Sequence, residues 1–260
     1  MKTHLGKYPG TRLKGSERYS KLYHFTKFET FKKIWETKSL KFGSIPELND
    51  INEAFKTISI DVIDFPLAKE DYVDLFNKAY RTIYQYKQIS LTKDYDSYIK
   101  GCMSPMMWGH YGEKGNGVCI ELDFSKIHFP GDVIFGEVKY KKLSKLFKLD
   151  PILFHKPCLM EKHIESKIKK IFFTKTADWK GENEFRIISN NHNYLDISSA
   201  ISMIYIAKLN QTNSFEVENI VDGKVPVEII RFVDQQNGDR IPIFSDSKTI
   251  RDQLNGVFKR

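Results

Sequence analysis

Two glutamates that lie two positions apart, Glu182 and Glu184, offer the clearest chemistry in this sequence. They stand in the stretch DWKGENEF, and Arg186 follows at the next alternate position. Because alternate residues of a β-strand point to the same face, we expect the three charged side chains to form a polar stripe opposite Phe185 and Ile187. Carboxylates held near each other and near a guanidinium acquire shifted pKa values and can do acid, base or electrostatic work. The alternative interpretation is a solvated strand edge.

Three further places carry side chains that could bind or react. His24 lies between aromatic residues in a predicted strand, where it is either a satisfied core residue or a hydrogen-bonding and general-base candidate. Ser90 and Thr92 are two apart in another predicted strand, so their hydroxyls share a face, although this pattern also reflects simple strand propensity. Trp108 and Tyr111 are three apart on a predicted helix. They indicate either core packing or a wall on which a flat ring stacks.

The composition of the 260 residues predicts one large folded domain with an ordinary core, since 41% of residues are hydrophobic and 13% are aromatic. The formal net charge is +8, and the lysines concentrate in 139–148 and 162–170. A basic surface attracts phosphate-rich partners such as nucleic acid, whereas solvated helix faces explain the same charges without any partner.

Several classes of protein are excluded by missing patterns. The three cysteines are far apart and form no CxxC pair, so we expect neither a disulfide framework nor a zinc site. No Walker A or GxGxxG motif occurs, the histidines lack metal-ligand spacing, and GEKGNG (112–117) indicates a turn. We see no leader peptide and no apolar run of about 18 residues, so we expect a cytoplasmic protein without a membrane partner. The spacing of the cysteines and histidines leads us to expect no metal.

The hydrophobic periodicities predict an α+β domain. Residues 1–19 are expected to be a polar arm, and 20–260 a single domain with a basic helical insertion around 142–174. Strands are predicted at 21–26, 88–93, 118–124, 133–140, 183–189, 200–207 and 227–234. Helices are predicted after residue 27, at 69–88, after the N-cap Ser104 with Pro105 at the first helical position, and at 246–258.

Four stretches of the sequence, 22–50, 104–124, 138–140 and 172–188, together form a further pattern. Its residues are Tyr23 and His24; Asn49, Asp50 and Glu53; Met107, Trp108 and Tyr111; and Lys175, Trp179, Glu182, Glu184 and Arg186. With these residues the chain resembles an uncharacterised bacterial family, domain-of-unknown-function family 2971, over about residues 20–210. The resemblance implies no reaction. The sequence departs from the family at Ile51, where proline is usual.

A second resemblance, in the order of the parts, is to the ADP-ribosyltransferase superfamily. There a first strand carries His or Arg, a middle strand carries a hydroxyl residue, and a late strand carries Glu-x-Glu. His24, Ser90 and the Glu182–Glu184 pair stand at these places. The resemblance implies an ADP-ribosyltransferase-like split β-sheet core with inserted helices. It also implies NAD as the substrate, and a toxin or phage-defence effector that modifies a protein or a nucleic acid.

The second resemblance also implies a role for each candidate residue. Glu184 would stabilise the oxocarbenium-like charge on the ribose, and Glu182 would act on the acceptor. The binding residues would be Tyr23, His24 on the adenosine-side ribose, Ser90, Trp108 or Tyr111 stacked on nicotinamide, and Arg186, paired with a glutamate or a phosphate. Lys175 is a further phosphate candidate.

Two other functions fit the same residues. In the first, a nucleic-acid-binding or nucleic-acid-processing protein, Glu182, Glu184 and Asp50 would gather a Mg²⁺ ion, because hard cations prefer oxygen ligands. In the second, a non-catalytic sensor, the Glu-x-Glu-x-Arg stripe would be a salt-bridged structural face. The sequence indicates no oligomeric state.

Overall fold

The fold was analysed in a computed structural model of the chain. It describes residues 11–12, 20–47, 58–60, 69–96, 98–141, 147–150, 152–207, 211–234 and 240–244. The helix predicted at 246–258 and the family residues Asn49, Asp50 and Glu53 lie outside these ranges.

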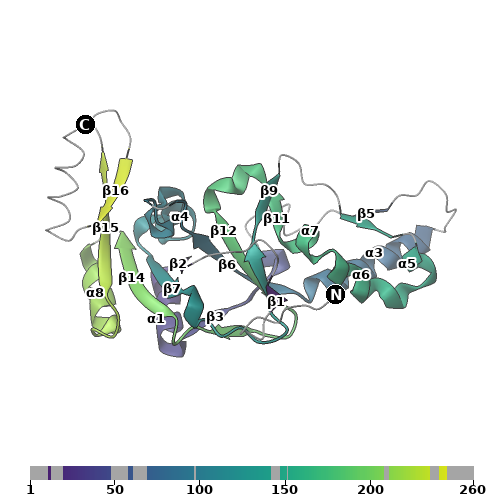
Figure 1. The fold of residues 1–260 in the computed structure, drawn as a ribbon, viewed down its shortest axis with the longest axis horizontal. Coiled ribbons are helices and arrows are strands. Elements are labelled where there is room, and N and C mark those ends of the chain that lie inside the picture. Colours follow the sequence, from purple (N-terminus) through teal and green to yellow (C-terminus); the bar gives the residue numbers. More distant parts are fainter. Residues whose placement is uncertain are drawn as a thin grey trace.

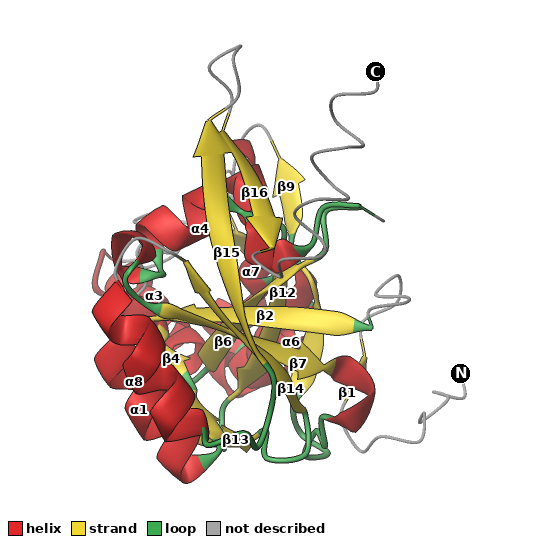
Figure 2. Ribbon diagram, turned by 90° about the vertical axis from the view of Figure 1, so that its left-hand side faces the viewer, coloured by secondary structure: helices red, strands yellow, loops and turns green. Residues whose placement is uncertain are grey.

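A ten-stranded mixed sheet forms the centre of the described part (Figures 1 and 2). Its strands follow the order β1-β8-β12-β6-β2-β7-β14-β15-β16, and the short strand β4 also pairs with β6. Their bounds are β1 Thr11–Arg12, β2 Lys21–Thr26, β4 Gly43–Ser44, β6 Lys87–Lys93, β7 Val118–Asp123, β8 Ile134–Glu137, β12 Glu184–Ser189, β14 Ile201–Ala207, β15 Val227–Asp234 and β16 Arg240–Phe244. Together with the helices, the sheet confirms the predicted α+β class.

One face of the sheet is covered by α1 (Phe28–Thr37) and α8 (Gln211–Val221) (Figure 2). Helix α1 forms where the sequence predicts it, because its apolar residues recur at helical spacing and are buried. They are Phe28, Phe31, Ile34 and Trp35. They pack on the apolar side chains of β2, β6, β7, β12 and β14 in the largest hydrophobic cluster.

The other face of the sheet carries α4 (Pro105–His110) over β2, β7 and β14. Ser104 caps this helix as predicted, since its side chain accepts a hydrogen bond from the Met107 amide at 3.3 Å. The predicted turn at 112–117 is present as the short 3₁₀ segment η3 (Glu113–Gly115). Glu113 then reaches across the fold, and its Oε2 accepts a hydrogen bond from the Phe28 amide at the start of α1.

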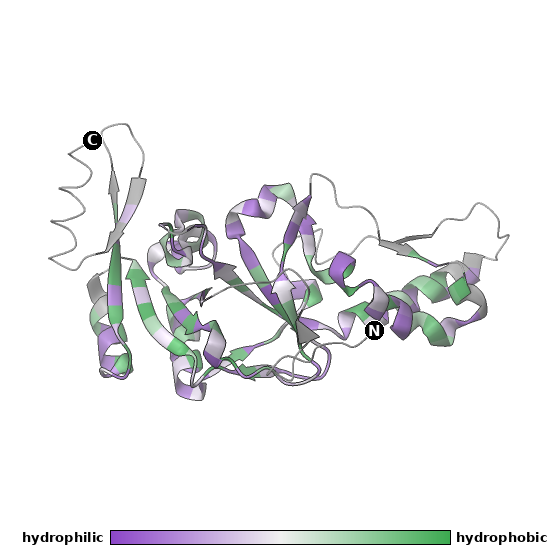
Figure 3. Cartoon of the chain, viewed as in Figure 1, coloured by the Kyte–Doolittle hydropathy of each residue, from purple (hydrophilic) through white to green (hydrophobic). Residues whose placement is uncertain are grey.

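A lobe of helices at one end of the sheet has its own hydrophobic cluster (Figure 1). The helices are α3 (Lys69–Tyr84), α5 (Ile152–His155), α6 (Met160–Ser166) and α7 (Ile168–Phe172). In Figure 3 these helices carry both hydrophobic and hydrophilic stretches, as amphipathic helices around a small core do. Helices α5, α6 and α7 come from the stretch 142–174, and α3 joins them from earlier in the chain.

Three two-stranded ribbons lie beside the sheet, and they revise two predictions. They pair β5 (Ile58–Ile60) with β10 (Phe147–Leu149), β3 (Ser39–Lys41) with β13 (Tyr194–Asp196), and β9 (Lys139–Lys141) with β11 (Thr174–Thr176). The strand predicted at 133–140 is therefore two strands, because the chain leaves β8 and pairs elsewhere as β9. The stretch expected to be mostly helical contains β10, and its last residue begins β11.

The remaining segments are short 3₁₀ turns between these elements. They are η1 (Ile45–Glu47), η2 (Gly101–Met103), η4 (Phe124–Lys126), η5 (Pro157–Leu159) and η6 (Ala177–Glu182). None of the helices in the described ranges is long and apolar enough to cross a membrane.

Candidate functional site

The sheet is split along one edge of β6. On this edge β6 pairs with β2 only through Thr92 and Lys93, and with β4 only through Lys87 and Gln88. Residues 89–91 between these two pairings face no described strand on this edge. The split sheet predicted from the sequence is thus located at β6, and the other edge of β6 stays fully paired with β12.

A pocket of about 260 Å³ fills this opening. Ser90, at the centre of the opening, is exposed although its neighbours in β6 are buried. The pocket is lined from both faces of the sheet, because Leu91 belongs to the cluster under α1 while Thr92 and Glu184 point to the opposite face. Its walls are Tyr23, His24, Phe25, Lys41, Gly43, Glu47, Gln88, Ile89, Ser90, Leu91, Thr92, Met107, Tyr111, Lys175, Glu182 and Glu184.

Glu182 reaches the pocket by a different route from the one its spacing predicts. It ends the 3₁₀ turn η6, and Asn183 then adopts a left-handed conformation with φ 45° before β12 begins at Glu184. The Asn183 side chain fixes this bend by donating hydrogen bonds to the carbonyls of Lys93 at 3.3 Å and Asp94 at 2.8 Å. The prediction of one strand face was therefore wrong for Glu182 and right for Glu184 and Arg186, which both lie in β12.

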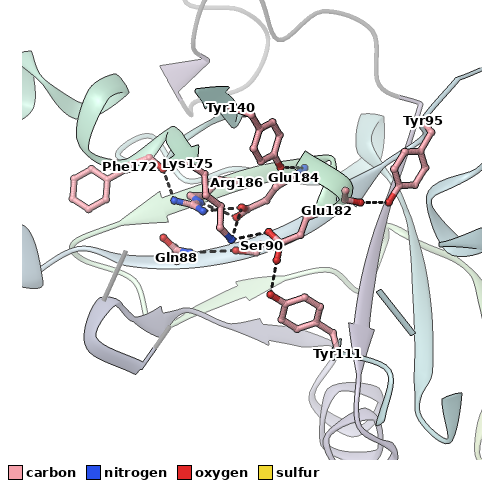
Figure 4. Close-up of polar contacts among 11 residues, drawn as sticks. Gln88, Ser90, Tyr95, Tyr111, Tyr140, Phe172, Lys175, Glu182, Glu184 and Arg186 are labelled. Atoms are coloured by element: carbon pink, nitrogen blue, oxygen red, sulfur yellow. Dashed lines mark hydrogen bonds and ion pairs between the residues drawn. The ribbon is translucent and has the colours of Figure 1, made fainter. Parts of the chain in front are cut away.

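Four buried charges meet at the floor of the pocket (Figure 4). Lys175 Nζ donates a hydrogen bond to Glu182 Oε2 at 2.7 Å and lies 3.8 Å from Glu184 Oε2. Arg186 holds Glu184 with two hydrogen bonds, from Nε to Oε1 at 2.8 Å and from its terminal nitrogen to Oε2 at 2.7 Å. Two acids and two bases balance in charge, as buried ions must.

Glu182 differs from Glu184 in its partners and in its proton affinity. The Tyr111 hydroxyl donates to Glu182 Oε1 at 2.6 Å. Burial raises the pKa of Glu182 above its ordinary value, and the nearby charge of Lys175 opposes the rise. A carboxyl group with a raised pKa that lines a pocket is a candidate to accept and return a proton.

Glu184 is held rigidly from three sides. Its amide donates a hydrogen bond to the Tyr140 hydroxyl at 2.8 Å, and the bidentate pair with Arg186 fixes its carboxylate. Arg186 also donates to the Phe172 carbonyl at 2.5 Å, so it joins the end of α7 to the sheet. Burial and the charge of Glu184 raise the pKa of Tyr140, which keeps that hydroxyl neutral.

Three polar atoms around the opening are buried without a hydrogen-bond partner. They are His24 Nδ1, Gln88 Oε1 and Thr92 Oγ1, and all three residues line the pocket. Buried polar groups in native proteins are almost always paired, so unpaired ones cost about 1–3 kcal/mol each. Several in one pocket offer hydrogen-bonding positions for water or for the polar groups of a ligand.

His24 is a neutral imidazole in this setting. Burial lowers its pKa to about 4, and a hydrogen bond with the Ser90 backbone only partly opposes this effect. A neutral imidazole can both donate and accept a hydrogen bond, which suits a sugar hydroxyl.

The folding stability should therefore depend on pH through His24. Its pKa is lower in the folded chain than the unfolded value of about 6.5, so the unfolded chain binds the extra proton. We expect the free energy of unfolding to fall as pH is lowered from about 6.5 to 4, with a His24 contribution of roughly 1–3 kcal/mol. His24→Gln should lack this pH dependence, so urea unfolding across the pH range should show the wild type losing stability relative to the variant as pH falls from about 6.5 to 4. Parallel curves would contradict the prediction. Glu182, whose raised pKa makes stability change with pH in the opposite direction, is present in both proteins, so its effect cancels in the comparison.

Six of the eight predicted site residues line one pocket. These are Tyr23, His24, Ser90, Tyr111, Glu182 and Glu184. The other two, Trp108 and Arg186, do not line it. Trp108 is 2% exposed, packs edge-on against Phe25 and donates its indole N–H to the Cys102 carbonyl at 2.7 Å, so core packing explains it. Arg186 is fully buried and pairs with Glu184, which is one of the two kinds of partner expected for it.

Two residues that contact the glutamates were not predicted to do so. They are Lys175 and Tyr140. Lys175 was expected to reach a phosphate, but it is 6% exposed and binds Glu182. Tyr140 was not considered, although it lies in a strand that pairs with Lys175. The available signal was Val138-Lys139-Tyr140, one of the stretches that carry the first resemblance. Gln88 also lines the pocket without any pattern that marks it, whereas Met107, another lining residue, is among the residues that carry the first resemblance.

Metal binding finds no support among the described residues, which contain no group of three His, Cys, Asp or Glu side chains able to hold an ion. Asp50, which the magnesium alternative requires, lies outside the described residues.

Comparisons with known proteins agree with the first resemblance. Residues 107–187 match the model of the family described as a protein of unknown function, DUF2971. This range contains Tyr111, Lys175, Glu182 and Glu184. A comparison with curated proteins finds no match. Among solved structures, DarT from Thermus sp. 2.9 in complex with ADP-ribosylated ssDNA is similar at 11% identity and a TM-score of 0.37, over 82% of this chain and 96% of that chain.

Proposed function

We propose that the chain consumes NAD and transfers ADP-ribose to an acceptor. The observation that carries the proposal is that His24, Glu182 and Glu184 line one pocket where the sheet opens. The ADP-ribosyltransferase resemblance assigned His24, Ser90 and the two glutamates to one site. These residues are distant in sequence, and they meet at this pocket. The unpaired atoms of His24, Gln88 and Thr92 add hydrogen-bonding capacity that a ribose and a carboxamide can satisfy.

The size of the pocket determines which part of the dinucleotide it can enclose. At about 260 Å³ it lies just below the roughly 300–1,000 Å³ of ordinary small-molecule sites. It therefore takes the nicotinamide and its ribose, while the adenosine half must extend beyond the pocket. His24, which lines the pocket, would then meet the nicotinamide-side ribose and not the adenosine-side ribose that the resemblance implied. Lys41, an exposed lysine in the pocket wall, is a candidate to meet the pyrophosphate there.

The reaction breaks the bond between nicotinamide and C1′ of the ribose and forms a bond from C1′ to the acceptor nucleophile. The sugar becomes positively charged in the transition state, and a fixed carboxylate beside it lowers the barrier. Glu184, which Arg186 holds in place, supplies this charge. Glu182, whose pKa burial raises, accepts the proton that the nucleophile loses. Nicotinamide leaves as a neutral molecule, so the proton and charge balance is complete.

The proposal is tested by following nicotinamide release from NAD. The purified chain is mixed with NAD alone and with total RNA, DNA or cell lysate, and NAD labelled in the adenylate detects the acceptor. We expect release with at least one acceptor. We expect His24→Ala to weaken NAD binding by about tenfold through the lost ribose hydrogen bond. Absence of nicotinamide release under every condition, together with no detectable binding of NAD, would overturn the proposal.

A further inference from the structure

The positive charge of the chain comes from one segment. Residues 138–181 contain 12 lysines and four acidic residues, which gives +8 and equals the net charge of the whole protein. The remaining 29 basic and 29 acidic residues cancel. The basic character is therefore a local property and is not a general solubility device.

This basic segment also builds one side of the pocket. Strands β9 and β11 pair in register, with Tyr140 beside Lys175 and Lys139 beside Thr174. Tyr140 and Lys175 contact the two glutamates. Because neighbours along a strand point to opposite sides, Lys139 and Lys141 project away from the glutamates, and both are exposed.

Further exposed lysines adjoin this ribbon. Helix α7 leads directly into it, since the Lys139 amide bonds to the Phe173 carbonyl at 3.0 Å. Asp178 is the one exposed acidic residue in this group, which comprises β9, Lys167, α7, β11 and η6. The exposed lysines there, which we call the basic ridge, are Lys139, Lys141, Lys167, Lys169, Lys170 and Lys180.

An aromatic side chain, Trp179, adjoins the buried Lys175–Glu182 pair. Trp179 is half-buried in η6, three residues before Glu182, and its ring lies 4.5 Å from Lys175 Nζ. The exposed imidazole of His110 approaches it at 6.4 Å between ring centroids. A partly exposed indole beside a carboxylate and next to lysines combines stacking with phosphate attraction, which is how proteins bind single-stranded nucleic acid.

We propose that the acceptor is a single-stranded nucleic acid, bound along the basic ridge with a base stacked on Trp179. The proposal rests on the proposed function of the pocket. A single strand is required because Glu182 is only 3% exposed, so the acceptor atom must enter a recess that a base stacked in a duplex cannot reach. Six exposed lysines and one exposed acid in these elements favour a partner that carries a phosphate on every unit of its chain.

The test measures the binding of fluorescent single-stranded oligonucleotides without NAD. Lys139→Gln/Lys141→Gln is compared with the wild type, and Lys33→Gln/Lys224→Gln is the matched control at exposed lysines outside the basic segment. We expect the ridge variant to bind about tenfold more weakly and its salt dependence to decrease by between one and two units of slope. The control should bind normally, and all three proteins should melt at the same temperature.

The outcomes separate this inference from the proposed function. Labelling of the oligonucleotide by NAD that is lost in the ridge variant, while its basal nicotinamide release persists, supports both. Binding that depends on the ridge without nicotinamide release supports the docking surface and rejects the proposed reaction. Equal binding by the ridge variant and the control, preference for duplex, or labelling of proteins alone would overturn the inference.

Discussion

Glu182→Gln is expected to lower the rate of ADP-ribose transfer by at least about 100-fold while the chain stays folded. Glutamine has the shape of glutamate, so its amide oxygen can accept the Lys175 hydrogen bond and its amide nitrogen can donate to the Tyr111 hydroxyl. Lys175 keeps a counter-charge, because Glu184 Oε2 lies 3.8 Å away. The substitution thus removes the proton acceptor and leaves the hydrogen bonds intact.

The measurement is single-turnover transfer to the acceptor, with a melting curve on the same sample. Tyr111→Phe is the matched control, since it removes a hydrogen bond to Glu182 and keeps the carboxylate; its rate should fall by less than that of Glu182→Gln. Full activity of Glu182→Gln would show that another group takes the proton. A rate that falls only in step with the melting temperature would indicate a structural role.

The parts of the fold that depend on local pattern were predictable. Helix α1 follows from apolar residues at helical spacing, and β2 and β6 follow from their short aromatic or β-branched runs. In β12, the alternation of Phe185 and Ile187 with Glu184 and Arg186 gave the right faces. These predictions succeed because the local order of apolar and polar residues determines the secondary structure and the side to which each residue points.

The errors at the site come from chain geometry over a few residues. Glu182 was assigned to a strand, but the left-handed conformation of Asn183 turns the chain just before β12. Asparagine tolerates that conformation well, so Gly181 and Asn183 were the signals of a turn. Trp108 and Tyr111 were expected on one helix face. Helix α4 ends at His110, however, and Tyr111 points to Glu182 while Trp108 packs inward.

The pocket itself could not be predicted, because it depends on which distant segments pair. It exists only because β2 and β4 each cover one end of the same edge of β6. Those pairings join segments separated by more than 40 residues, and no local pattern specifies such a register. The resemblance to the ADP-ribosyltransferase superfamily assigned His24 and Glu184 to one site. The pairing of the strands places both residues around one opening.

Arg186→Met is expected to destabilise the fold by about 3–5 kcal/mol, the largest stability effect predicted for the site. Glu184 is 2% exposed and would lose both hydrogen bonds from the guanidinium, and the Phe172 carbonyl would lose its donor. Lys175, at 3.8 Å from Glu184, replaces only part of this interaction. Urea unfolding should show the loss, with a melting temperature lower by roughly 10 °C. Arg81→Met, at an exposed position of α3, should change stability by less than about 0.5 kcal/mol.

The double variant Glu184→Gln/Arg186→Met decides whether the charge of Glu184 causes this loss. Once the carboxylate is neutral, the missing guanidinium leaves no buried unpaired charge, so the double variant should be more stable than Arg186→Met alone. If the two substitutions simply add, the cost comes from lost packing and from the link to α7. Glu184 would then be a structural residue, and the acid chemistry of the pocket would depend on Glu182 alone.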